Sequence, residues 1–343
     1  MKEIILHVGT EKTGSTSIQR ALELSTQKLQ DQGYLFPTTL GSPCHIHLTA
    51  CALRGSPNHP IRQHLALVDD DVFQHFLKKT KSAFFDELAS SSCDTVIISD
   101  EHINVHLIDQ GAMENYRSIC EEFGVISKVI IYLRAQDEFR VSLFSEAVKC
   151  ANLKGFDIDN PLPIFDNLPP RFNYSRILDN LSNVFGEKSL RVGLFEKDAL
   201  IGGDIVKDFC HKIGGSLSVI NSQTIEYNRS LDARIIRPLA QLCKALAPFQ
   251  SSDQFQLYRS ILERVQQSFD GPGLVMSADR HAAFMEQFRG QNSVLKARYF
   301  PSLSREDLFS TNIRAQAIGS QTNTYPECSM DWTEFHWTFA RSI

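Results

Sequence analysis

The chain has 343 residues, more than the roughly 250–300 at which one hydrophobic core stops growing, which predicts a large domain with an appended part. Hydrophobic residues make up 42% and charged residues 22% of the chain, so the composition excludes a disordered or fibrous protein. The 35 Lys and Arg against 40 Asp and Glu give a net charge of −5, which argues against a general nucleic-acid or anionic-membrane binder.

The order of the apolar runs predicts alternating strands and helices. Runs typical of buried strands occupy residues 2–8, 95–99, 127–133 and, more weakly, 190–195. Helical spacing of apolar residues is found at 15–33, 113–123, 137–151, 174–185 and 204–213. This alternation is typical of an α/β three-layer sandwich with a mainly parallel central sheet.

The strand pattern fades after Gly215, where the sequence predicts a change of organisation. Segments 233–247, 253–269 and 278–288 have helical periodicity, with a kink expected at Pro238. We therefore expect an α/β core at 1–215, with an insert at 34–92, and a mostly helical C-terminal part at 216–343. The aromatic tail that starts at Ala315 is expected to serve packing.

Cysteine usage and hydropathy predict a cytoplasmic protein. No run approaches the roughly 20 apolar residues that a membrane span needs, and no early run is long enough for a signal peptide. The eight cysteines are scattered without a C-x-x-C pair, a pattern typical of reduced thiols and not of a zinc knuckle or a disulfide framework.

The sharpest local feature is the segment GTEKTGSTS, residues 9–17, here called the anion loop, between the first strand and the first helix. Backbone N–H groups converge in such a turn, and the helix N-terminus adds about half a positive charge. Lys12 adds an ammonium group, while Gly9 and Gly14 allow close approach of the main chain. Together these features predict an anion-binding site.

The position of the lysine distinguishes this loop from a nucleoside-triphosphate loop. That loop follows the pattern G-x-x-x-x-G-K-[ST], whereas Lys12 precedes Gly14. The opening HVGTEKTGSTSIQ resembles instead the donor-binding loop of sulfotransferases of the bacterial branch. The resemblance implies a P-loop-like site for 3′-phosphoadenosine 5′-phosphosulfate (PAPS). The donor-binding residues that it implies here are Lys12, Thr13, Gly14, Ser15, Thr16 and Ser17.

The resemblance implies a second anion site, because PAPS also carries a 3′-phosphate. Arg134 follows the strand at 127–133, at the edge where open α/β sheets bind ligands, and Ser142 lies eight residues later. The segment YLRAQDEFRVSLF is similar to the family's Arg and Ser motif for the 3′-phosphate. A guanidinium suits phosphate because it donates two parallel charge-assisted hydrogen bonds.

The implied reaction is transfer of a sulfuryl group from PAPS to a hydroxyl or amine of a small-molecule or carbohydrate acceptor. Lys12 would stabilise the charge that develops on the leaving oxygen. No metal is expected for this chemistry. The insert at 34–92 does not select a sugar over a phenol, a lipid or a peptide as acceptor.

The base that takes the acceptor's proton has candidates in two places. His45 and His47 lie in GSPCHIHL, after the first helix, where sulfotransferases commonly place this group. Glu101 lies in IISDEHI, at the end of the strand at 95–99, and ranks after the two histidines. The histidines interpreted as structural or without a role include His7, His102 and His106.

Two other functions compete with sulfuryl transfer. The segment VIISDE is similar to the strand that ends in Asp-Glu at the magnesium site of ATP-hydrolysing enzymes. A nucleotide kinase or ATPase would use Asp100 to hold Mg-ATP, but it does not explain the position of Lys12 or the Arg134 motif. A catalytically inactive nucleotide-binding module is the third hypothesis.

Overall fold

The computed structural model describes residues 1–107, 110–214, 230–246 and 252–310, and its contacts divide the chain into two units. The first unit consists of Met1–Arg134 and Leu168–Tyr227, and the second of Ala135–Asn167 and Asn228–Ile343. The boundary expected at residue 215 and the aromatic tail from Ala315 lie outside the described residues. Residues 135–167, which we expected in the core, belong to the second unit.

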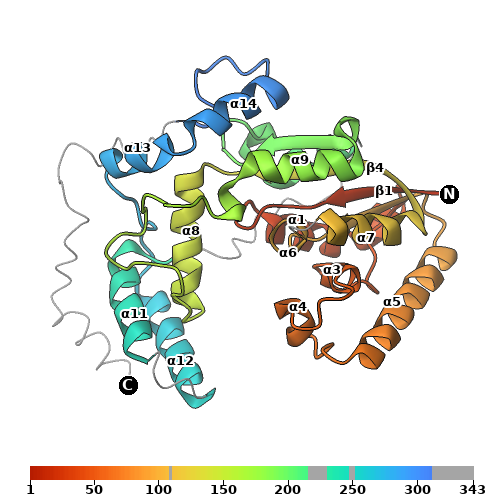
Figure 1. Ribbon diagram of the computed structural model, residues 1–343, viewed down its shortest axis with the longest axis horizontal. Helices are drawn as coiled ribbons and strands as arrows, with labels where there is room; N and C mark the ends of the chain where they lie inside the picture. The colour runs from red at the N-terminus through yellow and green to blue at the C-terminus, as the bar shows by residue number, and fades with distance from the viewer. Residues whose placement is uncertain (108–109, 215–229, 247–251, 311–343) are drawn as a thin grey trace. The chain divides into compact units, whose positions relative to one another are not determined.

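The first unit contains a five-stranded sheet in the order β2-β3-β1-β4-β5, with every neighbouring pair parallel. The strands are β1 (Lys2–His7), β2 (Tyr34–Leu35), β3 (Thr95–Ser99), β4 (Gly124–Leu133) and β5 (Leu190–Leu194). The predicted α/β class with a parallel sheet is confirmed, and the arrangement is consistent with a three-layer sandwich (Figure 1). The sequence analysis did not predict β2, because a strand of two residues is too short to show an alternation of apolar and polar residues.

The register of the sheet aligns the carboxyl ends of β1 and β3, whereas β4 continues to Leu133. His7 at the end of β1 pairs with Ser99 at the end of β3 and with Ile130 of β4. The loops that follow β1, β3 and β4 therefore leave the sheet at the same edge, where parallel α/β sheets bind ligands.

Helices cover the sheet of the first unit. They are α1 (Ser15–Leu24), α2 (Thr26–Gln30), α3 (Ile46–Ala52), α4 (Pro60–His64), α5 (Asp70–Ser90), α6 (Ile103–His106), α7 (Gln110–Glu121), α9 (Tyr174–Phe185) and α10 (Ile205–Ile213). On one face, Leu22 of α1 and Phe209 of α10 pack with Ile5, Ile97 and Ile130 of the sheet. Burying each such side chain contributes about 1.5–3 kcal/mol. The predicted helix 15–33 is interrupted at Ser25, so α1 and α2 are separate.

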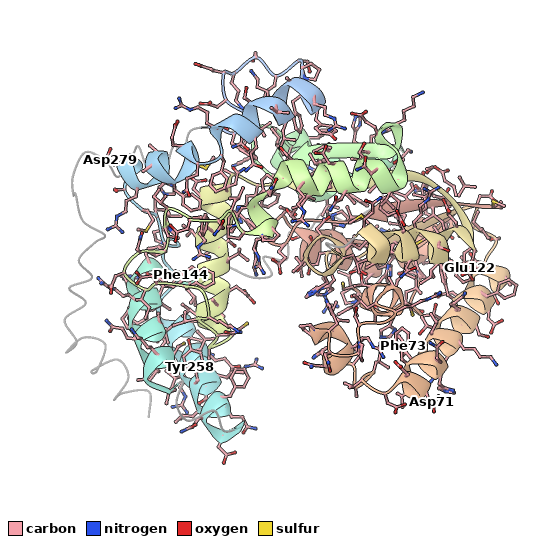
Figure 2. The ribbon with its side chains drawn as sticks, viewed as in Figure 1. Asp71, Phe73, Glu122, Phe144, Tyr258 and Asp279 are labelled. Atoms are coloured by element: carbon pink, nitrogen blue, oxygen red, sulfur yellow. The ribbon has the colours of Figure 1, made fainter. Side chains whose placement is uncertain are left out.

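The insert at 34–92 has its own buried contacts. Its last helix, α5, begins where the Asp69 carboxylate accepts a hydrogen bond from the Val72 N–H. The Arg62 guanidinium is fully buried, lies 3.9 Å from the centre of the Phe73 ring, and donates to the Leu67 carbonyl. Figure 2 labels Phe73 on α5. The insert is therefore packed around its own side chains, and its first half contains α3 and α4.

The second unit is helical in most of its described residues. Its helices are α8 (Gln136–Lys149), α11 (Ala233–Leu246), α12 (Ser252–Ser268), α13 (Ala278–Glu286) and α14 (Arg289–Tyr299). α8 packs against α11 and α13, and the buried Tyr258 hydroxyl of α12 donates to the Val148 carbonyl at 2.6 Å. These contacts explain why α8 belongs to this unit although it follows β4 in the chain.

None of the helices in the described parts of the chain is long and apolar enough to cross a membrane.

Candidate functional site at the carboxyl edge of the sheet

The anion loop starts at the carboxyl end of β1 and ends at the first turn of α1. Gly9, Lys12 and Gly14 have positive φ angles of 41°, 62° and 82°. A non-glycine residue held in this region costs about 1–3 kcal/mol, a strain that is concentrated at functional sites. The left-handed Gly14 lets the chain turn directly into α1, where its carbonyl accepts the Ile18 N–H at 3.1 Å.

Side chains within and beside the loop hold its shape. The Thr10 hydroxyl donates to the Tyr132 carbonyl at 2.7 Å, and the Thr13 hydroxyl donates to the Thr10 carbonyl at 2.6 Å. The Asn104 amide donates to the carbonyls of Val8 and Gly9. Thr13 is fully buried and its hydroxyl proton is used within the loop, so its side chain holds the shape of the loop. The binding of the donor by Thr13 stays a prediction.

The other predicted donor ligands of the loop lie around the start of α1. Ser15 is buried, with its hydroxyl 3.5 Å from the Thr10 carbonyl, whereas Thr16 and Ser17 are half-buried on the first turn. Lys12 is also half-buried. The first turn therefore presents hydroxyl groups at the positive end of a helix of 10 residues.

Glu101 lies next to the anion loop because of the sheet register. The pairing of β1 with β3 continues past the strands, since the Asp100 N–H donates to the His7 carbonyl at 2.9 Å. A Cβ atom placed on Gly9 would lie 3.2 Å from the Glu101 Cβ and 2.8 Å from the Ser15 hydroxyl oxygen. A side chain at Gly9 would therefore collide with Ser15 and crowd Glu101.

The surroundings of Glu101 change its acidity. Burial raises the pKa of the Glu101 carboxyl above its usual range, and the Glu11 carboxylate raises it further. A hydrogen bond from Ser15 and the charge of Lys12 lower the same pKa without reversing the shift. A carboxylate with a raised pKa is a better proton acceptor than an ordinary glutamate.

Arg134 follows β4 and reaches the anion loop. Its Nη1 donates to the Lys12 carbonyl at 3.0 Å, and its guanidinium carbon lies 5.5 Å from the centre of the Phe195 ring. The Tyr174 hydroxyl donates to the Arg134 carbonyl at 2.8 Å. The two cationic residues predicted from the sequence are thus neighbours within the first unit. Ser142 is half-buried on α8 of the second unit, so its pairing with Arg134 stays a prediction.

His45 is a structural residue in this fold, which corrects its expected role as the base. The Ser99 N–H donates to its Nδ1 at 2.9 Å, and its Nε2 lies 2.8 Å from the Pro37 carbonyl, to which it donates. Burial lowers the pKa of His45 to about 4, so the ring is neutral at pH 7. With one nitrogen accepting and the other donating, the ring has no free lone pair for an acceptor's proton.

His47, the partner of His45 in the same motif, lies on α3 and packs against α5. The centre of its ring is 5.4 Å from the centre of the Phe76 ring, in an edge-to-face arrangement. This contact belongs to the packing of the insert. The structure therefore does not bring His47 together with Lys12 as it does Glu101.

A group of three histidines near the sheet edge was missed by sequence reasoning. The ring of His106 lies 5.1 Å from that of His59 and 5.6 Å from that of His102, measured between ring centres. Burial lowers the pKa of His106 to about 4, with smaller contributions from His102, His59 and Arg171. The four-residue spacing of His102 and His106 on a helix could have indicated this pair, but nothing in the sequence pointed to His59.

Asp100 is fully buried beside Glu101. Its carboxylate accepts hydrogen bonds from the Thr49 hydroxyl at 2.6 Å and from the His102 N–H at 3.0 Å. Burial raises the pKa of Asp100 to about 6, although His102 and Thr49 lower it. This carboxylate joins α3 of the insert to the start of α6.

Comparisons with known proteins leave the function open. No family model matches the chain, and no solved structure matches it. A protein of Archaeoglobus fulgidus, described as uncharacterized, is 24% identical over 178 residues. That match covers 51% of this chain and 46% of the archaeal protein, so the chain aligns with less than half of its relative.

Proposed function

We propose that the protein is a PAPS-dependent sulfotransferase that acts on a hydroxyl or amine of a small-molecule or carbohydrate acceptor. The observation that carries the proposal is the meeting of Lys12, Arg134 and Glu101 around the anion loop. Two cationic side chains and a helix N-terminus suit a donor with two anionic groups. A carboxylate beside them suits removal of the acceptor's proton.

Each of the three side chains has a defined task in the proposed transfer. Glu101 takes the proton of the acceptor as the new bond between oxygen and sulfur forms. The bond between sulfur and the bridging oxygen of PAPS breaks, and adenosine 3′,5′-bisphosphate leaves with the electron pair. Lys12 stabilises the charge on that oxygen, and Arg134 binds the 3′-phosphate. We place Glu101 ahead of His45, because both ring nitrogens of His45 are occupied.

The direct test is a thermal shift of the full chain with adenosine 3′,5′-bisphosphate, beside ATP with Mg²⁺. A ligand at a hundred times its dissociation constant adds about 2.7 kcal/mol to folding stability, which shifts the melting temperature by several degrees. The proposal expects a shift with the bisphosphate. A shift with ATP and Mg²⁺ alone would favour the kinase, and a shift with neither would contradict nucleotide binding.

Substitutions at Lys12 and Arg134 test which residues bind the bisphosphate. Lys12→Ala and Arg134→Ala should each weaken bisphosphate binding by about ten- to a hundredfold, because each removes a charged hydrogen bond of about 1.5–3 kcal/mol. Lys78→Ala and Arg54→Ala, at exposed positions of the insert, make the same change in charge and should leave binding unchanged. Equal dissociation constants for Arg134→Ala and the unaltered protein would remove Arg134 from the site.

A further inference from the structure

Three side chains with different metal-binding atoms meet beside the anion loop. The Cys44 thiol comes from the insert, the Asp100 carboxylate follows β3, and the His102 ring precedes α6. Their ligand atoms all lie within 4.8 Å of one another, and the Cys44 sulfur is 3.9 Å from Asp100 Oδ1. In tetrahedral zinc sites the bonds are about 2.0–2.3 Å long, which places ligand atoms about 3.3–3.6 Å apart. Small side-chain rotations would close this difference.

The charge balance around Asp100 points independently to a cation. The carboxylate is fully buried, and among the described residues no Lys or Arg forms an ion pair with it. Its hydrogen-bond donors are the Thr49 hydroxyl, the His102 backbone N–H and, at 3.9 Å, the Cys44 thiol, which are all neutral. A buried carboxylate is costly unless it is paired with a cation or binds a metal. The Cys44 thiol and the His102 imidazole lie next to this carboxylate and would coordinate the same cation.

We propose that Cys44, Asp100 and His102 bind one Zn²⁺ ion. Thiolate, imidazole and carboxylate together are a ligand set that suits zinc, whereas Mg²⁺ and Ca²⁺ favour oxygen ligands alone. Binding releases the thiol proton of Cys44 to solvent, because thiolate is the form that binds metal. Three protein ligands leave a fourth position for water or a substrate atom.

The proposed site connects the insert to the catalytic edge. Cys44 lies just before α3, and Asp100 is the residue before Glu101, so the ion would tie the insert to the end of β3. This inference does not depend on sulfuryl transfer, because it rests on the positions of the three ligands and on the burial of Asp100.

The test uses the full chain after removal of metal with a chelator. Zn²⁺ is titrated against a chromophoric competitor, and Co²⁺ is then used as a spectroscopic substitute. The expected result is one ion per chain, with the visible bands of tetrahedral cobalt and a charge-transfer band from thiolate to cobalt. Cys44→Ser should abolish the charge-transfer band, and it should weaken Zn²⁺ binding at least tenfold, since even outer-shell changes cost about 10- to 100-fold. His102→Ala and Asp100→Asn should weaken binding as much.

Matched controls separate this site from other thiols and imidazoles. Cys150→Ser removes an exposed thiol and should leave the affinity and the cobalt spectrum unchanged. Cobalt bands without the charge-transfer band would place the ion on the histidine group His59, His102 and His106 and would overturn the assignment. Failure to bind one ion, or a charge-transfer band that persists in Cys44→Ser, would also overturn it. Circular dichroism of the metal-free variants checks folding, and Cys44→Ser and His102→Ala carry the test if Asp100→Asn does not fold.

Discussion

The two units bury polar side chains in different ways. In the second unit, Gln136 and Asn292 exchange two amide hydrogen bonds, at 2.8 and 3.1 Å. His281 Nδ1 lies 2.6 Å from the Asp137 carboxylate, and His281 Nε2 accepts the Met276 N–H at 3.3 Å. In the first unit, His7 Nε2 and Asn104 Oδ1 are buried without a hydrogen-bond partner near the carboxyl edge of the sheet.

The two sets of buried polar side chains differ in their place in the fold, between packed helices in the second unit and at the edge of the sheet in the first. Hydrogen-bonded groups such as His281 stabilise helix packing, and removing one partner leaves the other buried at a cost. Groups with unused hydrogen-bonding capacity, such as His7 at the end of β1 and Asn104 beside Gly9, lie near the sheet edge where ligands bind. We therefore expect substitutions in the second unit to change stability and substitutions at the sheet edge to change activity.

The largest expected effect is on turnover at the sheet edge. Glu101→Gln keeps the size of the side chain but removes the proton acceptor, so turnover with labelled PAPS should fall by about 10²–10⁴-fold. Binding of adenosine 3′,5′-bisphosphate, measured by thermal shift, should be retained. Glu114→Gln, at an exposed position of α7, is the matched control with unchanged turnover. Parallel losses of binding and turnover would make Glu101 a donor ligand and not the base.

The next effect concerns stability in the second unit. His281→Leu removes the partner of the buried Asp137 carboxylate and should lower the free energy of unfolding by about 3 kcal/mol, measured by urea denaturation. The double variant Asp137→Leu/His281→Leu should recover part of that loss, because the buried carboxylate is gone and only backbone N–H groups such as that of Met276 lose an acceptor. The single variant Asp137→Leu completes the comparison. If the loss of unfolding free energy in the double variant equals the sum of the losses in the two single variants, the pair is not coupled and the contrast between the units weakens.

A smaller effect is expected where the anion loop meets α1. A Cβ atom at Gly14 would lie 3.0 Å from the Phe195 ring and 3.2 Å from Ile205, at a φ of 82°. Gly14→Ala should therefore lower the free energy of unfolding by about 2–3 kcal/mol and weaken bisphosphate binding. Gly33→Ala has the same φ with no atom within 4 Å, so it should cost only about 1 kcal/mol. Equal costs would show that crowding at Gly14 is unimportant.

The effect that is smallest near neutral pH is a pH dependence that comes from His7. Burial lowers the pKa of His7 to about 3, so between pH 6.5 and 3 the unfolded chain binds a proton that the folded chain does not. Stability from this residue is complete above pH 6.5 and falls by up to about 1.4 kcal/mol per pH unit below it. His7→Gln should flatten this slope in urea denaturation at pH 6.5, 5.5 and 4.5. His75→Gln, at an exposed position, should leave the slope unchanged.

The fold was largely predictable because its signals are local. Apolar runs marked β1, β3, β4 and β5, and helical spacing marked most of the helices. The membership of α8 was not predictable, because it depends on contacts with α11 and α13, which lie far along the chain. The break at Ser25 between α1 and α2 also left no periodicity signal.

The site was predictable only in part. The glycines and Lys12 of the anion loop could be recognised because one short segment contains them all. The choice among His45, His47 and Glu101 could not be made from sequence, because it depends on which hydrogen bonds each side chain already makes. The approach of Arg134 to Lys12 depends on the neighbouring positions of β1 and β4 in the sheet.

By itself, the sequence determined the parallel α/β class and the anion loop, because backbone preference and periodicity act over a few residues. Only the tertiary structure decided that Glu101 faces Gly9, that both nitrogens of His45 are occupied, and that Cys44, Asp100 and His102 converge. The physical reason is strand register: the pairing of His7 with Ser99 fixes which residues after β3 meet the loop after β1. If the register of β1 and β3 shifted by one residue, Asp100 would take the place of Glu101 beside the anion loop.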